Sequence, residues 1–83
     1  MRIDITLGGA LIQFLPPDES GNQFTYTHES SVSLSELLGI LGIGREQRLL
    51  TILNGNVIHP DAFGQTILND GDALSLMPPI VAG

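Results

Sequence analysis

Few side chains in this 83-residue sequence could do chemistry, because it contains no cysteine and only two histidines. His59 and Asp61 are two positions apart, and so are Asp70 and Asp72. Such pairs could begin a metal site, but aspartates that flank a glycine are ordinary turn residues, and a calcium loop needs more oxygen ligands. The lack of thiols excludes disulfides, iron–sulfur clusters and cysteine nucleophiles. We therefore predict that the chain holds no metal.

The sequence also lacks the motifs of catalytic and phosphate-binding loops. His28 lies far from His59 in sequence, and no serine stands in the context of a nucleophile elbow, so a hydrolase triad has no support. Gly8 and Gly9 lack the lysine and the spacing of a phosphate loop, which favours a bulge or a sharp bend there. The side chains thus indicate no enzyme active site.

The most unusual segment is residues 78–83, which we call the tail. It is made of Pro78, Pro79, Ile80, Val81, Ala82 and Gly83. Proline fixes φ, so the proline pair stiffens the exit from whatever precedes it. Four extended residues at ~3.3 Å each reach about 13 Å beyond Pro79. A frayed terminus is the ordinary alternative, but apolar residues directly after two prolines favour a functional tail. We predict a folded domain over residues 1–77 and a flexible tail over 78–83.

The length and composition of the chain limit the kind of domain that can carry this tail. Eighty-three residues, 42% of them hydrophobic, are enough for a single core. Nine acidic residues against three arginines and no lysine give a net charge of −6, which disfavours a nucleic-acid partner. No apolar run approaches the ~20 residues of a membrane span, and the alternating N-terminus does not resemble a signal peptide. We expect a cytoplasmic protein with no membrane or nucleic-acid partner.

The N-terminal half predicts two strands. Ile3, Ile5 and Leu7 alternate with polar residues, and so do Phe24 and Tyr26. Residues 10–15 between them are apolar but fit neither the strand nor the helix period, so their conformation is left open. A long hairpin is the expected connection.

The middle of the chain predicts a short helix. Ser33 and Glu36 have the spacing of a capping box, and Gly42 provides a stop signal. Between them, leucines recur every three or four residues, at Leu34, Leu37, Leu38 and Leu41. The helix should have about two to three turns.

The C-terminal half predicts three further strands. Residues 49–53 form an apolar run fit for a central strand. Asn54 and Gly55 are a strong hairpin signal, and residues 57–58 should form the short return strand of that hairpin. A loop through His59 leads to an Asp-Gly-Asp turn and the last strand, over residues 74–77. The order of elements indicates an α+β roll with one helix on one face of a sheet.

Four segments, in order, resemble the MoaD/ThiS family of ubiquitin-like sulfur carriers. They are Gly9-Ala10-Leu11 leading to Phe14-Leu15-Pro16-Pro17, the helix start over residues 32–38, Ile52-Leu53-Asn54-Gly55, and the ending from Leu68 through Asp70-Gly71-Asp72 to Pro78-Pro79-Ile80. The resemblance covers essentially the whole chain. It implies the β-grasp fold, a mixed sheet of about four to five strands with one main helix.

The resemblance also implies a function for the tail. In this family the carboxylate of the C-terminal glycine, here Gly83, is adenylated with ATP by an enzyme of the ubiquitin-activating type and then converted to a thiocarboxylate. The chain would be a carrier with no turnover or bound cofactor of its own. The ending from Met77 to Ile80 is most similar to the small subunit of molybdopterin synthase, which implies a large catalytic (MoaE-like) partner subunit. The sequence departs from the family at Ala82, where a glycine is usual.

Three alternatives stay open. The chain could carry sulfur for thiamine or another pathway. It could be a ubiquitin-like modifier joined to targets through Gly83, although without lysine it could not form lysine-linked chains on itself. It could also be a β-grasp interaction domain without tail chemistry.

Overall fold

The first and last strands lie side by side in the centre of the sheet. The computed structural model describes residues 1–44 and 49–78. Five strands, in the order β2-β1-β5-β3-β4, form one mixed sheet. They are β1 (Arg2–Leu7), β2 (Gln23–Thr27), β3 (Leu50–Leu53), β4 (Asn56–Ile58) and β5 (Ala73–Met77). Among these five described strands, β1 and β5 pair in parallel and the other neighbours are antiparallel.

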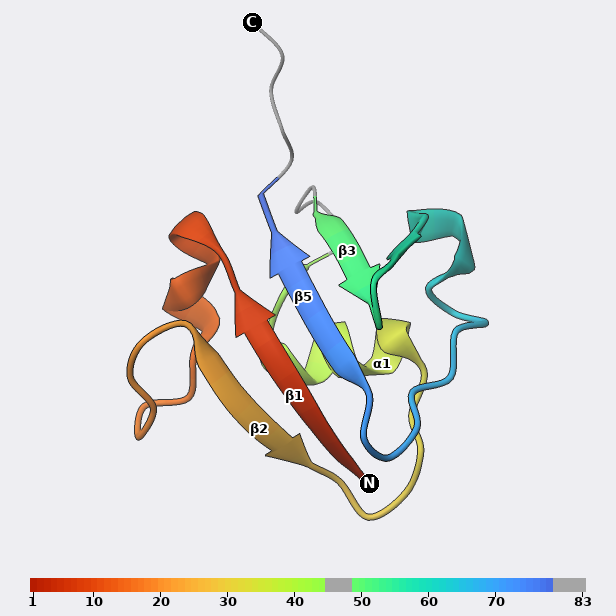
Figure 1. The fold of residues 1–83 in the computed structure, drawn as a ribbon, viewed down its shortest axis with the longest axis horizontal. Helices are drawn as coiled ribbons and strands as arrows, with labels where there is room; N and C mark the ends of the chain where they lie inside the picture. Colours follow the sequence, from red (N-terminus) through yellow and green to blue (C-terminus); the bar gives the residue numbers. More distant parts are fainter. Residues whose placement is uncertain (45–48, 79–83) are drawn as a thin grey trace, which may run out of the picture.

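One face of the sheet packs on the helix α1 (Leu34–Leu41), which lies behind the strands in Figure 1. Period-two alternation sends Ile3, Ile5 and Leu7 of β1 to this face, and each is at most 1% exposed. The core joins them to Leu74 and Leu76 of β5 and to Leu34, Leu37 and Leu38 of α1. The predicted α+β roll of the β-grasp type is confirmed.

Local signals fix both ends of α1. The Ser33 hydroxyl accepts from the Glu36 amide at 3.1 Å and donates to the Glu36 carboxylate at 3.2 Å. Gly42 has φ 82°, and the following amide, of Ile43, donates to the Leu38 carbonyl at 2.9 Å. The expected Ser33 cap and glycine stop are therefore both present, and the Glu36 carboxylate reaches back to the Ser33 hydroxyl.

Two short 3₁₀ helices lie in the connections between β1 and β2 and between β4 and β5. Most of the segment left open by the sequence, residues 10–15, belongs to η1 (Gly9–Phe14), in which only Leu11 is buried. The second, η2 (Pro60–Ala62), lies in the expected loop. Within the two described ranges, no helix is long and apolar enough to cross a membrane.

The predicted turns are present. Asn54 and Gly55 have φ values of 51° and 85°, which suit the tight turn between β3 and β4. At the Asp-Gly-Asp turn, Gly71 has φ 89° and the Asp72 amide donates to the Asn69 carbonyl at 3.1 Å.

Candidate functional site

The chain leaves the sheet from its central strand. At the end of β5, Leu76 pairs with Leu7 of β1 on one side, and Met77 pairs with Leu50 of β3 on the other. Figure 1 shows this end of β5 at the opposite end of the sheet from Met1. Pro78 follows and is exposed. The rest of the tail, residues 79–83 with the predicted reactive Gly83, lies outside the described residues.

Gly8 and Gly9 lie directly against this exit. The Gly8 amide donates to the Leu76 carbonyl at 2.9 Å, which extends the β1–β5 pairing by one residue. A Cβ atom at Gly8 would overlap the Met77 Sδ atom, and one at Gly9 would lie 2.8 Å from the Pro78 Cγ atom. The sharp bend expected here is confirmed, since Gly9 has φ 53° and begins η1. We call Gly8 and Gly9 the glycine pair.

Beside the exit, the sheet face turned away from α1 carries apolar side chains. They are Leu50 and Ile52 of β3, Val57 of β4 and Met77 of β5, and we call them the apolar face. Val57 is 67% exposed and the other three are partly exposed. None of the four belongs to the core or packs against it. A partner could therefore cover them without disturbing the fold.

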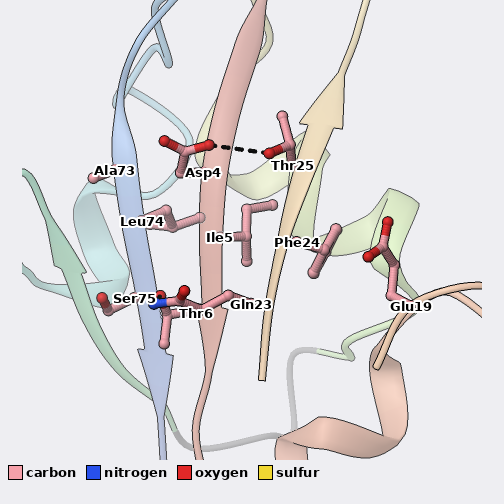
Figure 2. Close-up of a pocket in the computed structure, with 10 residues that line it drawn as sticks. All are labelled: Asp4, Ile5, Thr6, Glu19, Gln23, Phe24, Thr25, Ala73, Leu74 and Ser75. Atoms are coloured by element: carbon pink, nitrogen blue, oxygen red, sulfur yellow. Dashed lines mark hydrogen bonds between the residues drawn. The ribbon is translucent and has the colours of Figure 1, made fainter. Parts of the chain in front are cut away.

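The other half of the open face is polar. Thr25 of β2 donates to the Asp4 carboxylate at 3.1 Å, and the Gln23 amide donates to the Thr6 hydroxyl at 3.3 Å. These side chains, together with Glu19, line a hollow of about 510 Å³. Figure 2 shows the residues that line it and the bond from Thr25 to Asp4. Carboxylates, hydroxyls and an amide can accept and donate hydrogen bonds, but this set offers neither a positive charge nor a group of metal ligands.

The structure assigns the other candidate side chains to turns. His59 and Asp61 are 74% and 94% exposed, and the His59 Nδ1 atom accepts from the Asp61 amide at 3.2 Å, which caps η2. The Asp70 carboxylate accepts from the Arg2 amide at 2.8 Å. Within residues 1–44 and 49–78, no three metal-ligating side chains gather. The Asp72 carboxylate accepts from the Asn69 amide at 2.8 Å, so Asp70 and Asp72 both stabilise the Asp-Gly-Asp turn.

The sequence pattern alone did not predict the apolar face. The apolar run at residues 49–53 predicts a central strand but does not say which of its side chains are covered, and only Thr51 is fully buried. The useful signal is the strand order. Because β3 pairs with β5 and β4, Leu50 and Ile52 come to lie beside Met77 and Val57.

The comparisons with known proteins agree with this geometry. A family model described as the ThiS family matches residues 18–83. The crystal structure of a thiamine biosynthesis protein (ThiS) from Geobacter metallireducens is similar at 25% identity and a TM-score of 0.63, over 96% of this chain and 99% of that one. Its solution structure gives 24% identity and a TM-score of 0.56, over 96% and 87%.

A third solved structure is a complex. It is the protein–protein complex of subunits 1 and 2 of the molybdopterin-converting factor from Helicobacter pylori, with 24% identity and a TM-score of 0.58 over 100% of both chains. No curated protein matches the sequence.

Proposed function

This chain belongs to the ThiS family, and from that premise we propose that it is a sulfur carrier without turnover of its own. An activating enzyme joins the Gly83 carboxylate to the AMP portion of ATP and releases pyrophosphate. A sulfur donor then displaces AMP and leaves a thiocarboxylate, which a second enzyme uses. The observation that carries this proposal is the family match itself, which runs from residue 18 to Gly83.

The position of the exit supports the proposal. A carrier that offers its own carboxylate needs no nucleophile, metal or bound cofactor, because its partners supply ATP and thiols. What it needs is a stable body and a chain end that leaves it, and Pro78 is exposed at the end of the central strand. We take the cytoplasm as the place where such partners are met.

The apolar face supports a docking partner. Leu50 and Ile52 lie on β3, next to β5, and Val57 lies on β4, one strand further out. Because Leu50 pairs with Met77, a protein bound over these side chains would also lie close to Pro78. The fully buried centre of a protein–protein interface is more apolar than the rest of the surface and is surrounded by a polar rim. The net charge of −6 suits a partner with a basic rim. We propose that both the activating enzyme and a large catalytic subunit bind here in turn.

Our first choice of client is molybdopterin synthesis, because the Met77-Pro78-Pro79-Ile80 ending is similar to that of the molybdopterin synthase small subunit. A structural relative of this chain is in the complex of the two molybdopterin-converting factor subunits, and a large subunit of that kind is the partner we propose. A thiamine client is the second candidate, favoured by the similarity to the Geobacter protein at a TM-score of 0.63.

Intact mass spectrometry tests the carrier chemistry. Incubation with ATP, a sulfur source and each candidate activating enzyme from the same organism should replace one oxygen atom of the chain by sulfur. A variant that lacks Ala82 and Gly83 is the control and should stay unchanged. If the full chain is unmodified by every activating enzyme, the proposal is wrong.

The pathway that receives the sulfur is then identified by adding the sulfur-loaded chain to each candidate acceptor enzyme. We expect the mass to return to the carboxylate value with the large molybdopterin synthase subunit and its pterin substrate, and not with the thiazole-forming enzyme of thiamine synthesis. The reverse result would move the assignment to the thiamine pathway.

A further inference from the structure

We propose that the glycine pair positions the tail, because Gly8 and Gly9 leave room for Met77 and Pro78 and so set where and how the chain departs from β5. This inference rests on the proposed function, since the direction of departure matters only if a partner must receive the chain end. Gly8 and Gly9 are positioning residues and take no part in the chemistry.

A glycine at position 8 leaves room for the Met77 side chain. Its φ of −102° is available to any residue, so backbone freedom does not require glycine there. A Cβ atom would overlap the Met77 Sδ atom, so the flexible Met77 side chain would have to move to another rotamer. The adjacent hydrogen bond from the Gly8 amide to the Leu76 carbonyl, at 2.9 Å, holds the two segments together.

Gly9 combines backbone strain with a rigid neighbour. Its φ of 53° is unfavourable for most side chains. In addition, an added Cβ would lie 2.8 Å from Pro78 Cγ and 3.5 Å from Pro78 Cδ. A proline ring cannot rotate away as a long side chain does. A methyl group at position 9 must therefore move the residue with which the tail begins.

Six other glycines of the described chain do not have this property. An added Cβ would meet nothing within 4 Å at Gly21, Gly39, Gly42, Gly55, Gly64 or Gly71. Gly21 is the best control, because its φ of 82° also penalises a side chain while its surroundings are open. The variants Gly9→Ala and Gly21→Ala thus share the backbone cost, and only Gly9→Ala displaces Pro78.

Steady-state kinetics of sulfur loading separates positioning from stability. For Gly9→Ala we expect kcat to fall about tenfold or more relative to Gly21→Ala, because small displacements of reacting groups are costly, while KM stays similar. A loss of folded protein would act differently, because it lowers the concentration of competent carrier and so raises the apparent KM with kcat unchanged.

A second substitution checks that the effect passes through Pro78. Pro78→Ala removes the ring atoms that a methyl group at position 9 would strike. The double variant should therefore have the kcat of Pro78→Ala alone, with no further loss from Gly9→Ala. If the two losses simply multiply, Gly9 does not act through Pro78 and the inference is wrong.

Gly8→Ala keeps the test decisive if Gly9→Ala does not fold, since it carries no backbone strain. We expect it to shift the Met77 methyl resonance, which is easily assigned because the chain has only two methionines, and to lower kcat. Equal kcat values for wild type, Gly8→Ala and Gly9→Ala would overturn the inference and leave the carrier function intact. A wild-type chain that no activating enzyme loads would overturn both.

Discussion

Thr51 is a polar residue in the core. It is 1% exposed on the helix-facing side of β3, between Leu76 and Ile58 of the neighbouring strands. In the described part of the chain its hydroxyl has no hydrogen-bond partner. A buried hydroxyl in that condition costs about 1 to 3 kcal/mol. Valine has a similar branched shape and the same preference for strands.

Thr51→Val should accordingly stabilise the protein, by about 1 kcal/mol in the free energy of unfolding. Urea denaturation followed by circular dichroism measures the change. Thr25→Val is the matched control on β2, where the hydroxyl is exposed and donates to Asp4 at 3.1 Å, and it should bring no gain. A less stable Thr51→Val variant would show that the hydroxyl is satisfied in solution.

Among the helices and strands, the sequence predicted those that local signals determine. The helix was found because its cap, leucine stripe and glycine stop all lie within residues 33–42. The strands β1 and β2 were found from their alternation, and β3 and β4 from an apolar run and the Asn54-Gly55 turn that follows it. By contrast, η1 has no period of its own, and it forms where β1 ends against β5. Contacts between distant segments fix such a helix, and a single sequence does not display them.

The features of the candidate site also divide into those that local residues predict and those that depend on contacts between distant segments. The proline pair and the resemblance pointed to the tail, and the bend at Gly8 and Gly9 was expected from the glycines alone. Their contact with Met77 and Pro78 was not, because it joins the two ends of the chain. The Asn54 side chain is similar: it accepts from the Ala73 amide and donates to Asp72, at 2.8 and 2.9 Å, so two turns predicted separately form one structure.

Ser33→Ala tests how far the capping box stabilises α1. Removal of the hydroxyl leaves the Glu36 amide without its 3.1 Å acceptor, and we expect a loss of about 1 kcal/mol in the free energy of unfolding. Thermal and urea denaturation would measure it. Glu36→Gln retains an acceptor for the Ser33 hydroxyl and should cost less. Equal losses in the two variants would contradict the assigned roles.

The whole molecule carries a strong negative charge, with nine acidic residues, three arginines and no lysine. Charge of one sign steers diffusion toward an oppositely charged partner and affects association more than dissociation. Salt weakens this steering, since the Debye length falls to about 3 Å at 1 M ionic strength.

We therefore expect the association rate constant with the activating enzyme to fall about tenfold or more between low and high salt. The dissociation rate should change much less, because the apolar face supplies the contacts that hold the complex. Stopped-flow or surface-based kinetics at several salt concentrations would measure both. A dissociation rate that rises with salt while association stays constant would indicate that ion pairs, and not the apolar face, hold the partner.

The parallel pairing of β1 with β5 has a consequence for how the protein is made. Asp4 is in register with Ala73, and its amide donates to the Asp72 carbonyl at 3.0 Å, so β1 leaves the ribosome long before the strand that covers its inner edge. Until then the nascent chain can form the β1–β2 hairpin and α1, but it cannot close the sheet. Folding should therefore be completed only after translation of β5, and any truncated product that ends earlier would expose a bare β1 edge for quality-control proteases to recognise.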